Sequence, residues 1–163
     1  MSFQEVALLL DGPVGPLEAR YQNNPQATGL ALLCHPNPAQ GGSMLNKVVS
    51  TLQRTARDAG YSTLRFNYRG VGSSAGSHCL EEGEVDDAQA ALNWLREQHP
   101  GLPVTLLGFS FGGYVAASLA LRLAACGEDI QQLIMVAPAV SRLPEQVQFA
   151  PPMRLTLIQP ELD

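Results

Sequence analysis

The chain has 163 residues, of which 45% are hydrophobic and 15% charged, so it is long and apolar enough to fold as one globular domain. Its formal net charge is −5. This excludes the class of general nucleic-acid binders, which need a basic surface to displace counterions. No apolar stretch reaches membrane-spanning length, and the N-terminus lacks the basic region of a signal peptide. We therefore expect a cytoplasmic protein without a membrane span.

Cysteine and histidine spacing argues against a metal centre. Neither residue type recurs at the short intervals that zinc sites use. We therefore expect free thiols and no bound metal. The residues concerned are Cys34, Cys79, Cys126, His35, His78 and His99.

The first third of the chain predicts a hairpin, a buried strand and a helix. Residues 6–10 and 17–22 flank the turn sequence DGPVGP, which indicates a β-hairpin. Residues 28–36 form a continuous apolar run, as in a strand that is buried on both faces. The Pro- and Gly-rich residues 36–42 have no regular pattern. From Ser43, a candidate N-cap, apolar residues recur at helical spacing up to a stop at Gly60.

The remaining elements alternate between strand and helix. A strand over 61–70 and a Gly/Ser-rich loop precede a helix over 82–101, whose Asp86 and Asp87 we interpret as stabilising its positive end. Bracing of the loop is the interpretation preferred for Asn67 and Arg69. The other predicted elements are a strand over 102–109, a helix over 112–127, and strands over 131–139 and 153–161.

This order predicts an α/β fold with a mostly parallel, twisted sheet and helices on both faces. Ligands of such sheets bind at the carboxyl ends of the strands. The three unusual loops, 35–43, 69–78 and 108–113, all follow predicted strands. We therefore expect them to gather at one edge of the sheet.

The sequence GFSFG, residues 108–112, lies where a strand is predicted to become a helix. It fits the G-x-S-x-G pattern, in which a sharp turn holds a serine above the sheet and glycines avoid collisions. The following helix presents N–H groups that favour developing negative charge. Ser110 is therefore the candidate nucleophile. The alternative is a serine that only caps the helix.

Four segments together resemble the α/β-hydrolase family, and more narrowly its small, lidless bacterial serine hydrolases. They are LLCHPNPAQGGSMLNKVV, LRFNYRGVGSSAGS, LLGFSFGGYVA and LTLIQPELD. The resemblance implies a Ser–acid–His triad that cleaves esters or related acyl compounds through an acyl-enzyme. It also implies that no metal or organic cofactor takes part.

Site residues follow from the resemblance one position at a time. Ser110 matches the nucleophile and Asp163 the acid, while the backbone N–H of Phe111 is one oxyanion donor. The second donor belongs to the loop after the strand LALLC. Because prolines have no N–H, Asn37 is the candidate there within HPNP. The alternative is that HPNP is only a rigid turn.

The family's histidine should follow the acid, but no histidine follows Asp163. We therefore expect a single α/β-hydrolase domain over 1–163 that is incomplete at its C-terminus, lacking the last strand and helices. The alternative is a non-catalytic binding domain. His35 could serve as the base, although bracing its loop is the preferred interpretation. Residues 141–152 are too short for a cap domain, so the site should be open.

We expect a small acyl substrate and a carboxylesterase-like activity. Thioesterases and peptidases of this fold use the same parts. The apolar strand around residues 155–159 also leaves pairing with a second copy of the chain open.

Overall fold

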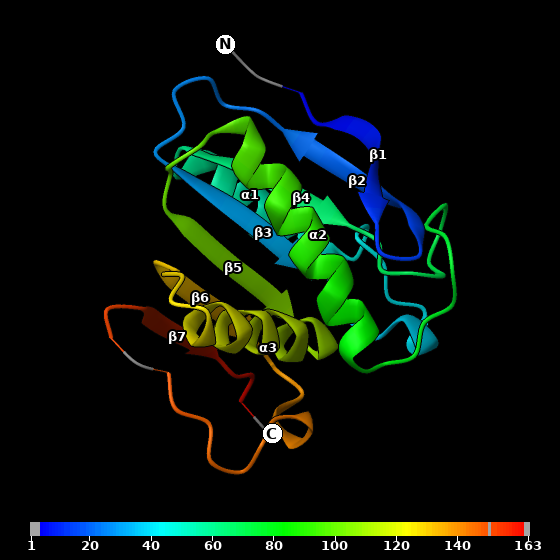
Figure 1. Ribbon diagram of the computed structural model, residues 1–163, viewed down its shortest axis with the longest axis vertical. Coiled ribbons are helices and arrows are strands. Elements are labelled where there is room, and N and C mark those ends of the chain that lie inside the picture. Colours follow the sequence, from blue (N-terminus) through cyan, green and yellow to red (C-terminus); the bar gives the residue numbers. More distant parts are fainter. Residues whose placement is uncertain (1–3, 150, 162–163) are drawn as a thin grey trace.

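The computed structural model describes residues 4–149 and 151–161. Within them, the chain alternates between strands and helices after an initial hairpin (Figure 1). In chain order the elements are β1 (Val6–Gly12), β2 (Gly15–Gln22), β3 (Gly29–Cys34), the 3-10 turn η1 (Pro38–Gln40), α1 (Lys47–Asp58), β4 (Tyr61–Phe66), α2 (Glu82–Gln98), β5 (Val104–Phe109), α3 (Phe111–Ala125), β6 (Gln132–Val136), the 3-10 turn η2 (Val140–Arg142) and β7 (Arg154–Ile158).

The strands form one sheet in the order β1-β2-β4-β3-β5-β6-β7. β1 pairs with β2 and β2 with β4 in antiparallel fashion, whereas all other neighbours are parallel. The predicted hairpin and mostly parallel sheet are confirmed. Parallel pairing brings the loops after β3, β4 and β5 to the same edge, as expected.

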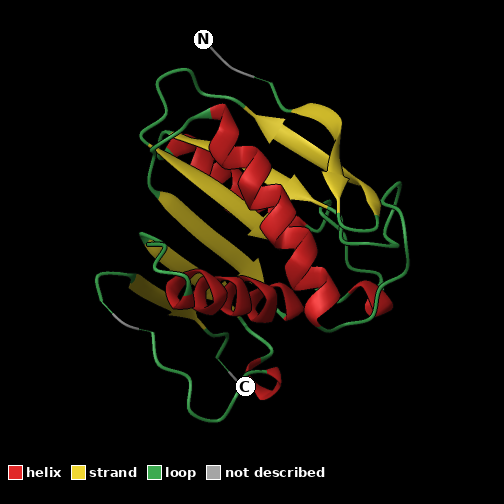
Figure 2. Ribbon diagram, in the orientation of Figure 1, coloured by secondary structure: helices red, strands yellow, loops and turns green. Residues whose placement is uncertain are grey.

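Helices cover both faces of the sheet, as predicted. In Figure 2, α2 and α3 cross the near face, and α1 lies behind the sheet. Alternate residues of β3 supply the two cores: Leu30 and Leu32 belong to the larger core with α2 and α3, and Ala31 and Leu33 to the smaller core with α1. Burial on both faces accounts for the unbroken apolar sequence of this strand.

The helix predicted from Ser43 begins later, at Lys47, so the N-cap assignment to Ser43 is wrong. Asn46 is the cap, and its Oδ1 accepts from the N–H groups of Val48 (2.8 Å) and Val49 (3.3 Å). The Ser43 hydroxyl instead accepts from Leu45 N–H within a turn. The Met44 N–H donates to Asn67 Oδ1 at 2.9 Å. This bond keeps the residues just before Lys47 out of the helix.

Strand ends also differ from the prediction. β4 stops at Phe66 rather than at residue 70, because a turn closed by Val71 N–H on the Tyr68 carbonyl follows. β6 stops at Val136 because Ala137 adopts a positive φ of 43°. The residues expected to be irregular after β3 contain the short turn η1, which begins at Pro38.

β7 is an edge strand with apolar side chains in contact with solvent. Leu155, Leu157 and Ile158 are 47%, 50% and 48% exposed. Its backbone pairs only with β6 among the described residues. Among all the residues that the structure describes, no helix is long and apolar enough to cross a membrane.

Candidate active site

Ser110 occupies a strained bend between β5 and α3. Its φ of 55° and ψ of −118° lie outside the regions that residues with side chains favour. Three backbone hydrogen bonds hold it there. Its N–H donates to the Val136 carbonyl at 2.9 Å, and its carbonyl accepts from Gly113 at 2.9 Å and Ala139 at 3.1 Å. The strain is therefore maintained by the first turn of α3 and by the segment at the end of β6.

Glycines make this bend sterically feasible. A Cβ at Gly108 would collide with the Gly112 carbonyl, and a Cβ at Gly112 with the carbonyl of Cys34. A Cβ at Gly113 would lie 2.7 Å from Pro138 Cβ. The start of α3 thus packs directly against the end of β3. This close approach gives the glycines of the motif a steric role.

The loop after β4 joins the loops after β3 and β5 through Tyr68. This fully buried side chain donates from its hydroxyl to the His35 carbonyl at 2.8 Å. Its ring meets that of Phe111 edge-on, with centroids 5.8 Å apart. The expected gathering of the three loops is confirmed. Sequence reasoning missed Tyr68, and no local pattern distinguishes it from an ordinary strand aromatic.

The loop after β3 is held in a compact turn. Asn37 Oδ1 accepts from Ala39 N–H at 2.8 Å, and its carbonyl accepts from Gln40 and Gly42. Within the described residues, no group accepts a hydrogen bond from the backbone N–H of Asn37 or of Phe111. These are the two amides that the sequence singled out as oxyanion donors.

An open hollow of about 280 Å³ joins Ser110 to this loop. The half-buried Ser110 forms part of its wall. The other lining residues are Pro36, Asn37, Gln40, Gly41, Gly42, Asn46 and Phe109. Ser110 and Asn37 are thus brought together, whereas the Phe111 side chain is buried. The structure places a hydroxyl and polar groups around one small space.

His35 is fully buried, and both of its ring nitrogens are engaged. Nδ1 donates to the Pro36 carbonyl at 2.7 Å, and Nε2 accepts from Tyr68 N–H at 3.2 Å. Burial lowers the pKa of His35 to about 4, so the ring is neutral at pH 7. Neither nitrogen is left to accept the Ser110 proton. The geometry is that of a loop brace.

The other candidates lie elsewhere or outside the described residues. Asp163 falls outside them. His78 lies in the exposed loop after β4, and His99 follows α2 with its Nε2 on Asn23 Oδ1 at 2.8 Å. No histidine is among the described residues that line the Ser110 hollow.

The sequence suggested that Asp86 and Asp87 stabilise the positive, N-terminal end of α2. The structure assigns both carboxylates to other partners. Glu81 and Glu84 form the capping box of α2 instead. The fully buried Asp87 carboxylate accepts from the backbone N–H, Nε and Nη2 of Arg69 at 2.9, 3.0 and 2.9 Å. Asp86 pairs with Arg122 at 2.8 Å. Arg69 therefore braces the loop after β4, as preferred from the sequence.

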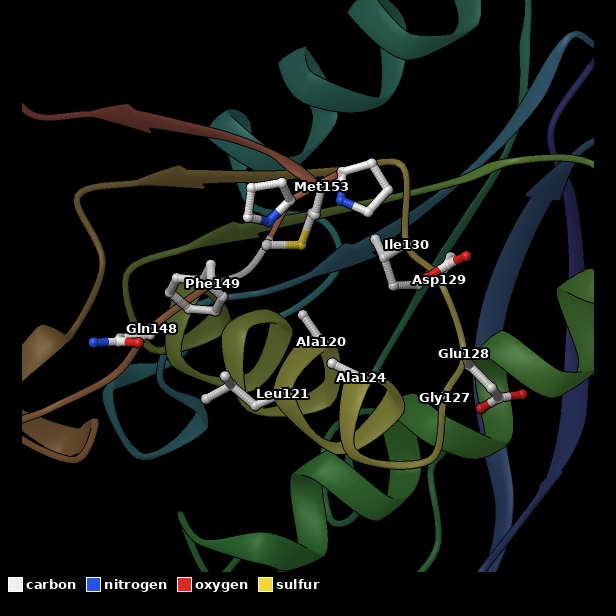
Figure 3. Close-up of a pocket in the computed structure, with 12 residues that line it drawn as sticks. Ala120, Leu121, Ala124, Gly127, Glu128, Asp129, Ile130, Gln148, Phe149 and Met153 are labelled. Carbon is white, nitrogen blue, oxygen red and sulfur yellow. The ribbon is translucent and has the colours of Figure 1, made fainter.

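A second hollow, of about 240 Å³, lies beside the C-terminal end of α3 (Figure 3). The last turns of α3 form one wall, with Ala120 and Ala124, and Phe149 and Met153 face them. Ser110 precedes the opposite end of this helix, so at 1.5 Å per residue Ala120 and Ala124 lie about 15 and 21 Å further along it. The mainly apolar hollow takes no part in the geometry around the serine.

Comparisons with known proteins agree with this architecture. The sequence profile of the alpha/beta hydrolase fold matches residues 31–159. The uncharacterized protein RP471 of Rickettsia prowazekii is 40% identical over 139 residues, which are 83% of this chain and 56% of RP471. The chain thus spans little more than half the length of this curated relative.

Two solved structures are similar over nearly the whole chain. XC6422 from Xanthomonas campestris, described as an α/β serine hydrolase without a lid, has 41% identity and a TM-score of 0.83, covering 98% of this chain and 72% of XC6422. An α/β serine hydrolase homologue from Coxiella burnetii has 31% identity and a TM-score of 0.81, covering 98% of this chain and 89% of its own. Between η2 and β7 the described residues of this chain likewise carry no helix that could form a lid. The chain belongs to the α/β-hydrolase family and is similar to its lidless bacterial serine hydrolases.

Proposed function

We propose that this protein is a serine hydrolase of the carboxylesterase type, with Ser110 as its nucleophile. The observation that carries the proposal is the strained Ser110 backbone, held by Val136, Gly113 and Ala139 at the edge of an open hollow. Strain of this kind persists only where surrounding structure maintains it, and it is common at catalytic groups. Membership of the family and the similarity to serine hydrolases support the same role.

The chemical step begins when Ser110 Oγ attacks the carbonyl carbon of an ester. A base takes the serine proton, and the carbonyl electron pair moves to oxygen. The backbone N–H groups of Asn37 and Phe111 stabilise this oxyanion. Collapse of the intermediate breaks the bond to the leaving alcohol, which departs with the electron pair and receives the proton. Water then cleaves the acyl-enzyme by the same sequence of steps.

No described histidine lines the hollow beside Ser110, so no base is assigned to the first step. In the family the base is a histidine that follows the acid, here Asp163, in chain order. His99 is the last histidine of this sequence. The proposal therefore rests on Ser110 and the two amides. A non-catalytic binding domain is the second candidate, favoured by the engagement of both His35 ring nitrogens and by the lack of a histidine among the described residues that line the hollow.

A fluorophosphonate probe tests the proposal, because it reacts with activated serine hydroxyls. We expect the phosphonyl group on Ser110, located by mass spectrometry of peptides, and no labelling of Ser110→Ala. The variant Ser118→Ala removes an α3 hydroxyl away from the bend and is the matched control. Labelling that does not require Ser110, or none in the folded protein, would favour the binding domain.

A further inference from the structure

Carboxamide side chains form much of the wall of the Ser110 hollow. Asn37, Gln40 and Asn46 line it beside the serine. None of its lining residues, all of which are described, carries a charge. The hollow is therefore polar and uncharged. The kind of group that the hollow binds depends on whether the oxygen or the NH₂ group of each carboxamide is available for a hydrogen bond.

Two of the three carboxamides have their oxygens occupied by backbone groups. Asn37 Oδ1 accepts from Ala39 N–H at 2.8 Å, and Asn46 Oδ1 accepts from the N–H groups of Val48 and Val49 at 2.8 and 3.3 Å. These backbone donors fix which atom is oxygen, since the opposite assignment would set N–H against NH₂. Each side chain therefore has its Nδ2 donors left for another partner.

No described residue accepts a hydrogen bond from either Nδ2 group. Both asparagines are half-buried. Because both side chains line the hollow, a group that enters it displaces water from their polar atoms. An alkyl group would leave them unpaired, whereas an oxygen atom would accept from them. An ion would find no opposite charge there.

Building on the proposed function, we propose that the hollow selects small, uncharged groups that carry an acceptor oxygen close to the scissile carbonyl. Ether, hydroxyl and carbonyl oxygens meet this requirement. The volume of about 280 Å³ lies near the lower end of small-molecule pockets, which suits a group of a few heavy atoms. The preferred substrate class is thus short oxygenated esters rather than simple alkanoates.

Two esters of equal chain length provide the test: 4-nitrophenyl methoxyacetate and 4-nitrophenyl butyrate, which differ by one ether oxygen in place of a methylene. The rate of 4-nitrophenolate release and the acyl mass on Ser110 give the acylation rate constant for each ester. The ratio of the two constants is then compared among variants. The intrinsic reactivities of the esters are the same throughout, so they cancel in this comparison.

Asn46→Asp and Asn46→Thr retain an oxygen that can cap α1 but lack the Nδ2 donors. Asn93→Asp introduces the same charge change on the exposed face of α2 and is the matched control. We expect the methoxyacetate-to-butyrate ratio to fall about fivefold in both Asn46 variants, the loss of about one hydrogen bond. The ratio should not change in Asn93→Asp.

The outcomes separate this inference from the proposed function. If Ser110 is acylated but both Asn46 variants keep the wild-type ratio, the substrate preference is wrong and the serine hydrolase proposal stands. If neither ester nor the fluorophosphonate modifies Ser110 in the folded protein, both are wrong. A fall in the ratio confined to the two Asn46 variants supports the preference.

Discussion

Tyr68 and His35 are joined by two hydrogen bonds that run in the same direction. The Tyr68 hydroxyl donates to the His35 carbonyl at 2.8 Å, and the Tyr68 backbone N–H donates to His35 Nε2 at 3.2 Å. Their rings also stack in a tilted arrangement, with centroids 4.0 Å apart. This pair ties the loop after β4 to the loop that carries Asn37.

Removing the Tyr68 hydroxyl should destabilise the protein. In Tyr68→Phe, the His35 carbonyl loses its donor in a fully buried environment, which typically costs about 1–3 kcal/mol. The free energy of unfolding in urea measures the effect. Tyr61→Phe is the control, because the Tyr61 hydroxyl makes no hydrogen bond with the described residues. Equal losses in the two variants would mean that the bond to His35 adds no stability.

His35 should make the folded protein sensitive to acid. Its pKa is lowered to about 4 from 6.5, chiefly by burial. Below pH 6.5 the His35 side chain of the unfolded protein binds a proton, whereas that of the folded protein binds it only below about pH 4. The free energy of unfolding therefore falls as the pH decreases from 6.5 to 4. The full loss is about 3 kcal/mol, at 1.36 kcal/mol per pKa unit.

Unfolding free energies of wild type and His35→Gln, measured from pH 7.5 to 4, isolate this contribution. The variant should show the weaker pH dependence in the acidic range. His78→Gln, which replaces a histidine in an exposed loop, is the matched control. Parallel curves for wild type and His35→Gln would contradict the assignment.

Asp86 and Asp87 should differ sharply although they are neighbours. The Asp87 side chain is 0% exposed and pairs with Arg69, which is 13% exposed. Asp87→Asn removes one partner of a buried pair, a change that usually costs about 3–5 kcal/mol. Asp86→Asn alters a pair that is 47% and 34% exposed, so we expect a loss below about 1 kcal/mol. Urea unfolding compares them, and similar losses would rule out a bracing role for Asp87.

Asn37→Pro should slow acylation of Ser110, because it removes the backbone N–H proposed to bind the oxyanion. The φ of Asn37 is −54°, which a proline ring permits. Loss of one such donor typically lowers the rate about 100-fold or more. Asn37→Ala keeps the N–H but loses the side-chain bond to Ala39, so it reports the effect of the turn alone. Stopped-flow measurement of 4-nitrophenolate release compares the two variants, and equal rates would place the donor elsewhere.

The sheet and the bend at Ser110 could be predicted because their signals are local. Continuous apolar runs mark strands that are buried on both faces, and the glycines at positions 108 and 112 fit the G-x-S-x-G pattern of a sharp turn. The start of α1 could not be predicted in this way. The choice of Asn46 over Ser43 depends on Met44, whose N–H is held by Asn67 from the loop after β4.

Partners that are distant in sequence account for the other misses. Asp87 lies in the second turn of α2, where its negative charge can be explained by the nearby positive end of the helix alone. Its actual partner, Arg69, comes from the preceding loop. Tyr68 likewise has the pattern of a core aromatic, and only the fold brings its hydroxyl to His35. Asp163 lies outside the described residues, so its role remains a prediction.

The contact between Gly112 and the Cys34 carbonyl has a consequence for engineering. A larger residue at the start of α3 would push the loop at Asn37 outward, so these two segments have to be exchanged as a matched set. Chimaeras with related hydrolases should tolerate a graft of both segments from one donor better than a graft of either alone.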